Sequence, residues 1–413
     1  MGGRPVTARP PGGGRRTVRT RLAHSTEALA GRLRVGELGS LPVLISLAAI
    51  WLIFAGLDEA FLSPRNLSNL SIDVVGTGLI AVGVVFVLLL GEIDLSVASV
   101  SGLSAAVFAV LNVHHGMPEA PAVALAVALG TAIGFFQGFV FTKVGVPAFV
   151  VTLAGLLGWN GLMLYILGAT GTVNLDDDGL VAQLTDYYFS YVAVAYGVAA
   201  VGVAGYFLAA VADARRRRSA GVPARSTREI AVRTAALAAV AFATAAVLNR
   251  FQGLPLALLV FLVLLVVLDQ VLRRTRYGRT VFALGGRLEA ARRAGISVDR
   301  VRISVFMVSG TMAALGGLFL ASRVTSASQS SGGGNLLMNA IAAAVIGGTS
   351  LFGGRGTVWS ALFGVLVIQS IASGVALLGI RGAVQFMITG GVLLLAVVID
   401  SLSRRAQKAH GRV

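Results

Sequence analysis

Cysteine is absent from this 413-residue sequence, and charged residues make up only 13% of it. The absence of cysteine excludes disulfide bonds, thiol catalysis and metal sites with thiolate ligands. A soluble chain has about 25% charged residues, so the few charges here cannot form a water-facing surface for a chain of this length. Because 56% of the residues are hydrophobic and the mean hydropathy is +0.84, we expect a membrane protein.

Histidine and lysine are also scarce, and the common catalytic motifs are missing. Four histidines, two of them adjacent (His114 and His115), leave little for a catalytic metal, so we expect no metal site and no cofactor. The two lysines, Lys143 and Lys408, do not lie in a G-x-x-x-x-G-K-[ST] phosphate loop, which excludes ATP binding by that route. The motifs G-x-S-x-G and H-E-x-x-H are absent as well. The sequence therefore favours a protein that is not an enzyme.

Long apolar runs, in contrast, are abundant. A helix needs about 20 apolar residues to cross the hydrocarbon core of a bilayer. Twelve stretches meet or nearly meet this length: 41–57, 70–90, 96–113, 121–141, 148–167, 188–211, 232–248, 254–272, 302–321, 336–348, 357–378 and 383–399. The tenth is too short for a full crossing and predicts a half-helix, which is tolerated only where protein or water surrounds its end. We predict an all-α polytopic membrane protein with about twelve transmembrane segments.

Lysine and arginine are distributed unevenly between the loops. If the first helix starts inside the cell, 30 of the 34 lysines and arginines lie in cytoplasmic segments, and only Arg65, Arg250, Arg323 and Arg381 lie outside. Orientation follows this bias in short loops, so we expect both termini in the cytoplasm. The formal charge of +16 then reflects membrane topology. We expect the lipid bilayer as a partner, and no nucleic acid.

The two ends of the chain are predicted to lie outside the transmembrane domain. Residues 1–37 are rich in Gly, Pro and Arg and cannot bury a core, so we expect a disordered basic cytoplasmic tail; a contact with anionic lipid or nucleic acid is the alternative role for it. Residues 38–402 are predicted to form the transmembrane domain, and residues 403–413 a second cytoplasmic tail. The four arginines at 215–218 are interpreted as a positive cluster that keeps this loop from being translocated across the membrane.

The basic loop 273–301, between the eighth and ninth predicted crossings, carries the strongest local pattern. Residues 288–294 are helix formers, preceded by Gly285 and Gly286 and followed by Gly295 as a C-terminal stop. This predicts a two-turn helix outside the membrane. Isolated helices shorter than about 12 residues are marginal in water, so either the neighbouring transmembrane helices or a docked partner must hold it.

Four segments together resemble one protein family. Glu289-Ala290-Ala291-x-x-x-Gly295 is similar to the E-A-A-x-x-x-G loop of ABC importer permeases. The segments 91–96 (GEIDLS), 146–153 (VPAFVVTL) and 346–354 (IGGTSLFGG) are similar to other motifs of the monosaccharide permeases in that family, and the resemblance covers about residues 70–405. Two extra helices around Arg215, where ribose-type permeases are shorter, make the chain resemble the D-xylose type most.

The resemblance implies a mechanism and a set of partners. In such importers two permease subunits form the pore in the bacterial plasma membrane, each docks its loop helix into a cytoplasmic ATPase subunit, and an extracytoplasmic sugar-binding protein delivers the monosaccharide. The second permease subunit here is expected to be another copy of this chain. Glu289, Ala290, Ala291 and Gly295 match the coupling motif, and Gly286, Arg292 and Arg293 are the further residues expected to couple to the ATPase.

The residue types in the coupling motif suit a docked helix. Small Ala and Gly residues permit close backbone approach, and the charged residues can pair across an interface. An ordinary amphipathic loop helix is the alternative. The chain departs from the family pattern at Arg287, where Asn or Asp is frequent, and at Glu92, where Gly is usual.

Polar residues in or beside the apolar runs are candidates for the translocation pathway, because lipid contact would waste their hydrogen bonds. They are Glu92, Asp94, Ser96, Gln137, Asn160, Asn335, Thr349, Ser350 and Gln369. Asp94 and Ser96 suit helix capping, pathway gating or, for Asp94, proton coupling. The amides either line the path or link helices.

These observations favour the permease subunit of an ATP-driven importer for a monosaccharide, D-xylose or a related pentose, working by alternating access. The alternative is a proton-coupled secondary sugar transporter with Glu92 or Asp94 as the carrier. A membrane scaffold without flux would leave the predicted half-helix and the docking loop unexplained.

Overall fold

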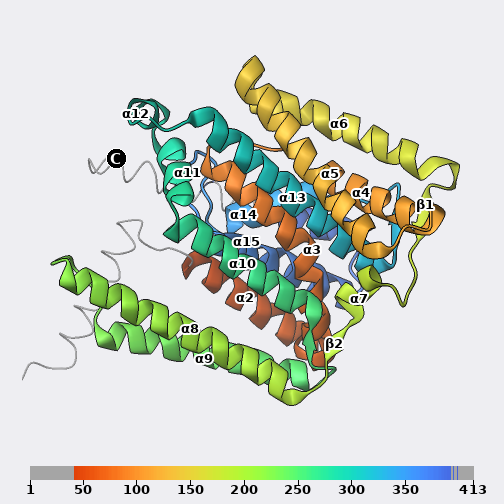
Figure 1. Cartoon of the computed structure of the whole chain (residues 1–413). Helices are drawn as coiled ribbons and strands as arrows, with labels where there is room; N and C mark the ends of the chain where they lie inside the picture. Colours follow the sequence, from red (N-terminus) through yellow and green to blue (C-terminus); the bar gives the residue numbers. More distant parts are fainter. Residues whose placement is uncertain (1–40, 392–393, 395–397, 399–413) are drawn as a thin grey trace, which may run out of the picture.

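The computed structural model describes residues 41–391, 394 and 398, and this part of the chain is almost entirely helical (Figure 1). The α-helices are α2 (Leu41–Leu57), α3 (Pro64–Leu89), α4 (Val97–Ala109), α5 (Glu119–Phe139), α6 (Ala148–Leu167), α7 (Leu180–Asp186), α8 (Val192–Ser219), α9 (Thr227–Asn249), α10 (Leu256–Arg274), α11 (Arg276–Gly286), α12 (Leu288–Arg293), α13 (Val298–Val324), α14 (Leu336–Ile346) and α15 (Trp359–Leu377). Short 3-10 or π turns extend or precede several of them: η1 (Glu59–Leu62), η2 (Val110–His114), η3 (Val140–Val144) and η4 (Gly168–Thr170).

The predicted crossings and the observed helices agree closely. Within the described part of the chain, nine helices are long and apolar enough to cross a membrane: α3, α4 with η2, α5 with η3, α6 with η4, α8, α9, α10, α13 and α15. The first predicted crossing matches α2, and the predicted half-helix is α14, which has only 11 residues. The twelfth predicted crossing, 383–399, lies partly outside the described residues. The structure therefore confirms an all-α polytopic fold.

Two predicted helix starts are wrong, because short strands occupy them. The sixth and eighth crossings were expected to begin at 188 and 254, but β2 (Tyr188–Phe189) pairs antiparallel with β3 (Leu254–Pro255), and the helices begin after them. A second pair joins β1 (Thr172–Asn174) to β4 (Ser326–Ser328). Each pair joins segments that are far apart in the sequence, and short apolar runs by themselves do not distinguish a strand from a helix.

Helix α13 lies at the centre of the bundle and packs against α3, α4 and α5. Helix α3 is also central, since 94% of the residues in its most apolar 18-residue stretch are buried. The crossing of α5 and α13 is very close at Gly130 and Gly310, where a Cβ on either glycine would collide with the other's carbonyl oxygen. Small residues at such crossings are how helices pack tightly in a membrane.

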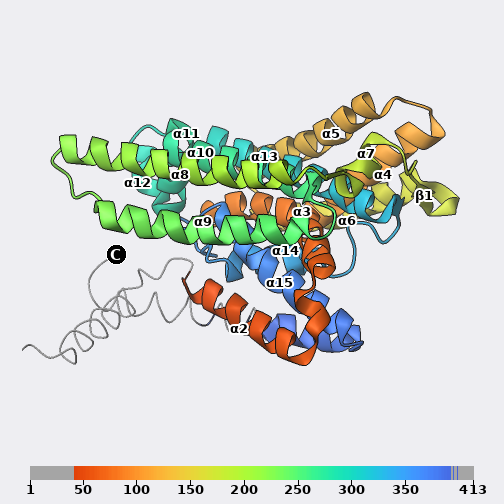
Figure 2. The same cartoon turned by 90° about the horizontal axis from the view of Figure 1, so that it is seen from below.

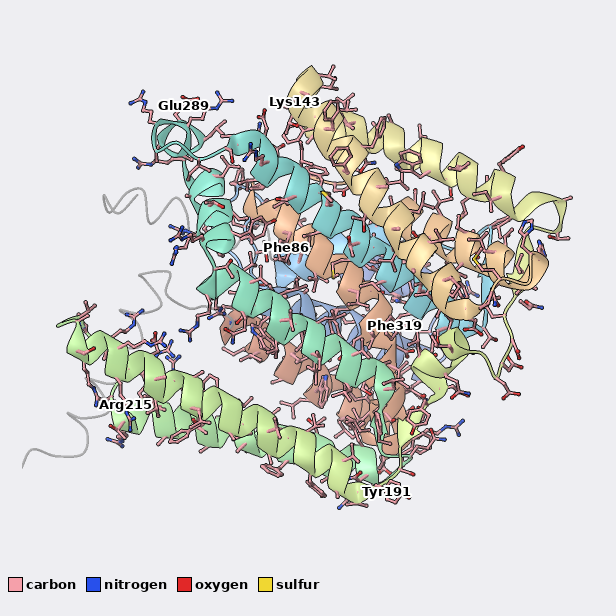
Figure 3. The ribbon with its side chains drawn as sticks, viewed as in Figure 1. Phe86, Lys143, Tyr191, Arg215, Glu289 and Phe319 are labelled. Atoms are coloured by element: carbon pink, nitrogen blue, oxygen red, sulfur yellow. The ribbon has the colours of Figure 1, made fainter. Side chains whose placement is uncertain are left out.

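Helices α8 and α9 form a hairpin at the side of the bundle in Figure 1, and they lie in front of the bundle in the view from below (Figure 2). They pack mainly on each other, and they join the bundle through the β2–β3 pair and through contacts of α9 with α3. Figure 3 shows Arg215, near the end of α8, at the same end of the molecule as Lys143 and Glu289, whereas Tyr191 lies at the other. We call the end that carries Glu289 the inner end.

Candidate functional site

The loop 273–301 contains two helices, not one. Helix α11 begins after Thr275, whose Oγ1 accepts a hydrogen bond from the amide of Gly278 at 3.2 Å, and it buries Val281 and Leu284. Gly285 and Gly286 precede α12, as expected, and they are also the last residues of α11. The N-cap threonine followed by apolar residues three apart was the signal that could have predicted this helix.

Helix α12 is the predicted coupling helix, and its end is built as expected. Gly295 has a left-handed φ of +77°. The amide of Ile296 donates to the carbonyl of Ala291 at 3.1 Å, and the amide of Gly295 donates to that of Arg292 at 3.0 Å. This pair of bonds is the Schellman motif, which ends a helix and reverses the chain.

The predicted coupling residues divide into an exposed face and one anchor. Ala291 is buried, and it holds α12 against the rest of the protein. The other six are exposed at the inner end: Gly286, Glu289, Ala290, Arg292, Arg293 and Gly295. The side chain of Glu289 is 72% exposed, and its ion pair with Arg292 is long at 3.7 Å. The exposed charges of α12 are therefore available to a partner.

Arg287 weakens the start of α12. It occupies the N-cap position with φ −150° and ψ 97°, but its side chain makes no capping hydrogen bond. Its guanidinium group has donors only and cannot accept from the first amides of the helix. Asn or Asp at this position would supply the missing acceptor.

Four glycines lie where α11 meets the loop after α3 and the loop before α15. We call Gly91, Gly285, Gly353 and Gly354 the glycine junction. The amide of Gly354 donates to the carbonyl of Leu89, the last residue of α3, at 2.9 Å. A Cβ on Gly285 would collide with that same carbonyl, and a Cβ on Gly353 would lie 2.7 Å from the carbonyl oxygen of Gly285. Three separate segments thus touch backbone to backbone, with no side chain between them.

Charged groups tie the start of α13 to the loops around it. The guanidinium group of Arg302 lies 3.2 Å from the carboxylate of Glu92 and 4.6 Å from the ring centre of Phe141. Lys143 pairs with Asp299 at 2.5 Å. Burial raises the pKa of Glu92 above its ordinary value, and the positive charge of Arg302 opposes part of that rise. Glu92, which stands where the family usually has glycine, therefore forms an ion pair with Arg302.

Asp94 is almost fully buried, at 4% exposure, and its carboxylate is fully engaged. One oxygen accepts from the amide of Ser96 at 2.9 Å and from its hydroxyl at 2.7 Å, and the other accepts from the hydroxyl of Ser309 on α13 at 2.9 Å. The expectation that the Ser96 side chain caps α4 is wrong. Ser96 occupies the N-cap position without a capping bond, because its hydroxyl contacts Asp94 and, at 3.0 Å, the amide oxygen of Gln137.

Other pathway candidates link helices or shape turns. The amide of Gln369 on α15 donates to the carbonyl of Asp73 on α3 at 2.9 Å. The hydroxyl of Ser350 accepts from the amide of Phe352 at 3.1 Å, which closes a turn beside the glycine junction. Thr349 is buried, and its hydroxyl has no partner within the described residues. These contacts favour the linking role for Gln369 and a turn-forming role for Ser350.

The remaining two candidates make no such contact. Asn335 occupies the N-cap position of α14 without a capping bond, and Asn160 is half-buried on α6. The structure therefore does not bring the nine pathway candidates into one site. It gathers six at the inner end around the start of α4 and the turn before α15: Glu92, Asp94, Ser96, Gln137, Thr349 and Ser350.

Sequence reasoning missed an ion pair toward the opposite end. Arg323, near the end of α13, donates to the carboxylate of Asp73 at 2.8 Å and lies 3.4 Å from the amide oxygen of Asn69. Asp73 lay inside a predicted crossing, and an acid in an apolar span is itself a signal of a partner. Ser309 was missed because a serine inside a helix carries no comparable signal.

Comparisons with known proteins agree with these motifs. Residues 66–397 match the family described as branched-chain amino acid transport system / permease component. The xylose transport system permease protein of Escherichia coli strain K12 is 35% identical over 365 residues, which cover 88% of this chain and 92% of that protein. The Haemophilus influenzae xylose permease is also 35% identical, over 88% of this chain and 96% of its own length.

Ribose permeases match as well, at lower identity. The ribose import permease protein of Bacillus subtilis is 31% identical over 88% of this chain and 94% of its own length. A search of solved structures found no match. The long family match and the xylose permeases that align over nearly their full length agree with the nine apolar helices. The chain therefore belongs to this family of membrane transport permeases, in the group that contains the xylose and ribose permeases of ABC importers.

Proposed function

We propose that the chain is the membrane-spanning subunit of an ATP-driven importer that moves D-xylose or a related pentose by alternating access. The observation that carries the proposal is α12, an exposed charged turn fixed by Ala291 and the Gly295 turn, which follows a helix in backbone contact with the bundle. A six-residue helix is not stable alone, so its exposed face supports a docking role. The xylose-permease relatives support the choice of sugar.

The glycine junction supplies a route from α12 into the bundle. A partner that moves α12 also moves α11, whose last turn touches the end of α3 and the loop before α15 through Leu89, Gly353 and Gly354. Side chains can absorb a displacement by changing rotamer, whereas backbone contacts cannot. The second route is α13 itself, which follows α12 directly and is tied to the loop before α4 through Arg302 and Glu92.

The loop between β4 and α14 supports a path by which the sugar enters from the outer side. Gly332 lies against the backbone of α4, since a Cβ there would collide with the carbonyl of Ala98. An irregular backbone beside a spanning helix must face protein or water, because lipid cannot satisfy its polar groups. Exposed Ser330 and Gly333 therefore favour a water-filled approach. Neutral hydroxyls and backbone amides suit an uncharged polyol.

The geometry of Asp94 argues against the proton-coupled alternative. A proton carrier must exchange its proton with water, but Asp94 is buried and accepts three hydrogen bonds from Ser96 and Ser309. These bonds stabilise the charged carboxylate and give it a structural role between α4 and α13. Glu92 is likewise occupied by Arg302.

The test is reconstitution of the chain in proteoliposomes with a cytoplasmic ATPase subunit and an extracytoplasmic xylose-binding protein. We expect labelled xylose to move only with ATP and an active ATPase, and we expect two copies of the chain in each purified complex. An ATPase variant without hydrolysis is the control. Uptake driven by a proton gradient without the ATPase would refute the proposal, and transport of ribose but not xylose would correct the sugar.

A further inference from the structure

Helix α8 is longer than the hydrocarbon core of a bilayer is thick. The turns that extend beyond the core carry the densest positive charge in the described part of the chain. Its 28 residues make a helix about 42 Å long, whereas the hydrocarbon core is about 30 Å thick. About two turns therefore project beyond the core. The charges at 215–218 show that the projecting turns are at the inner end, where Arg215 is seen in Figure 3.

The hairpin has almost no protein around it. In the most apolar 18-residue stretch of each helix, only 6% of the residues of α8 and 11% of those of α9 are buried within the structure. Only Ala195 and Ala214 of α8 are buried. In a single copy of the chain, most of the spanning part of α8 that α9 does not cover is therefore exposed toward lipid, which places the arginines that follow at the level of the headgroups.

One face of α8 forms a groove whose chemistry changes along its length. The groove is an open hollow on the surface of this one helix, with a volume of about 650 Å³, and it is lined by Phe207, Leu208, Val211, Ala212, Arg215 and Arg216. These residues recur in pairs four positions apart, so they form one stripe along the helix. The floor is apolar toward the membrane centre, and two guanidinium groups stand at the headgroup end.

The two arginines of the groove are free to bind an anion. The segment 213–233 holds seven arginines and two acidic residues. Both acids already have partners: Asp213 pairs with Arg217 at 3.2 Å, and Glu229 pairs with Arg233 at 2.8 Å. Within the described residues, Arg215 and Arg216 make no ion pair.

We propose that this groove binds an anionic phospholipid of the inner leaflet. One acyl chain lies along Phe207, Leu208 and Val211, and Arg215 and Arg216 hold the phosphate and its anionic headgroup. Arginine matches phosphate with two parallel N–H donors. A headgroup with an added positive charge would face the arginines unfavourably, which selects an anionic lipid over a zwitterionic one. The bound lipid would fix the depth of a hairpin that the bundle itself barely holds.

The test is native mass spectrometry of the full chain titrated with phosphatidylglycerol and with phosphatidylcholine. We expect phosphatidylglycerol to bind more tightly. We expect R215Q/R216Q to weaken phosphatidylglycerol binding by about 30-fold, or about fivefold for each arginine. The matched control, R225Q/R228Q, removes the same charge from the same segment outside the groove and should weaken binding clearly less than R215Q/R216Q does.

A third variant separates the groove from general charge attraction. F207A keeps every charge but removes part of the apolar floor, so it should weaken phosphatidylglycerol binding several-fold, with the elution volume of the purified chain unchanged. Equal losses in the two arginine pairs, no loss in F207A, or equal binding of the two lipids would overturn the proposal. A shift of R215Q/R216Q or F207A from dimer to monomer would instead identify this face as a contact between two copies and would also overturn it.

Discussion

Gly295 determines where α12 ends, because its φ of +77° is a conformation that other residues adopt only at a cost. No atom lies within 4 Å of the position where its Cβ would be, so a substitution there tests backbone conformation alone. A β-branched residue in the left-handed region costs about 1–2 kcal/mol, whereas asparagine is tolerated there.

We therefore expect Gly295→Val to reduce ATP-driven sugar uptake several-fold and to weaken capture of the ATPase subunit, while membrane insertion stays unchanged. Gly295→Asn should keep most of both activities. The measurements are uptake in proteoliposomes and co-purification with the ATPase. If the valine variant transports normally, α12 is not the docking element.

Arg287 leaves the first amides of α12 without a side-chain acceptor. We expect Arg287→Asn to stabilise the helix by about 1 kcal/mol, because the asparagine oxygen can accept from the amide of Glu289 or Ala290. Hydrogen exchange at these amides should slow by about fivefold for that gain. Arg287→Ala, which removes the charge without adding an acceptor, is the control. Equal protection in the two variants would show that the first turn of α12 is held in another way.

At the scale of elements, the glycine junction connects α11 to the ends of α3 and of the loop before α15. Gly285 and Gly286 offer a matched pair, since they are adjacent in the last turn of α11. A Cβ on Gly285 would collide with the carbonyl of Leu89, whereas a Cβ on Gly286 would meet nothing within 4 Å. Their substitution by alanine therefore has the same effect on helix propensity and a different effect on the junction.

We expect Gly285→Ala to lower thermal stability in detergent by about 1–3 kcal/mol and to reduce the ATP hydrolysis that is coupled to transport, because the backbones of α11 and α3 must separate. Gly286→Ala should match the parent protein or be slightly more stable. Thermal unfolding and coupled hydrolysis are the measurements. Identical behaviour of the two variants would remove the glycine junction from the coupling route.

At the scale of the whole molecule, the absence of cysteine allows the orientation to be tested directly. Single cysteines at Arg218, Arg293 and Asp177 sample the hairpin, α12 and the opposite end; all three positions are exposed. Asp177 follows β1, which pairs with the strand after the far end of α13. A membrane-impermeant maleimide added to intact cells should label Asp177→Cys only, and inside-out vesicles should give the reverse pattern. Labelling of Arg293→Cys from outside would refute a cytoplasmic docking helix.

The features that were predictable from the sequence are those carried by neighbouring residues. Hydropathy over about 20 residues located the spans, including the half-helix α14, since a crossing is a local property of composition. Gly295 marked the end of α12 because a left-handed residue is needed at that one position. Helix α11 was missed although its cap at Thr275 is local, because the glycines at its end were interpreted as a break before a helix.

What composition, periodicity and single glycines determined is thus a helical membrane protein with a short exposed helix on one loop, since they act over a few residues; the transport role came from the resemblance of four motifs to the permease family. The tertiary structure decided which distant groups meet: Asp94 with Ser309, Glu92 with Arg302, the strand of Tyr188 with that of Leu254, and the backbone contacts of Gly285. These contacts join residues from about 65 to more than 200 positions apart. Packing of whole helices brings them together, and no local pattern in the chain records that packing.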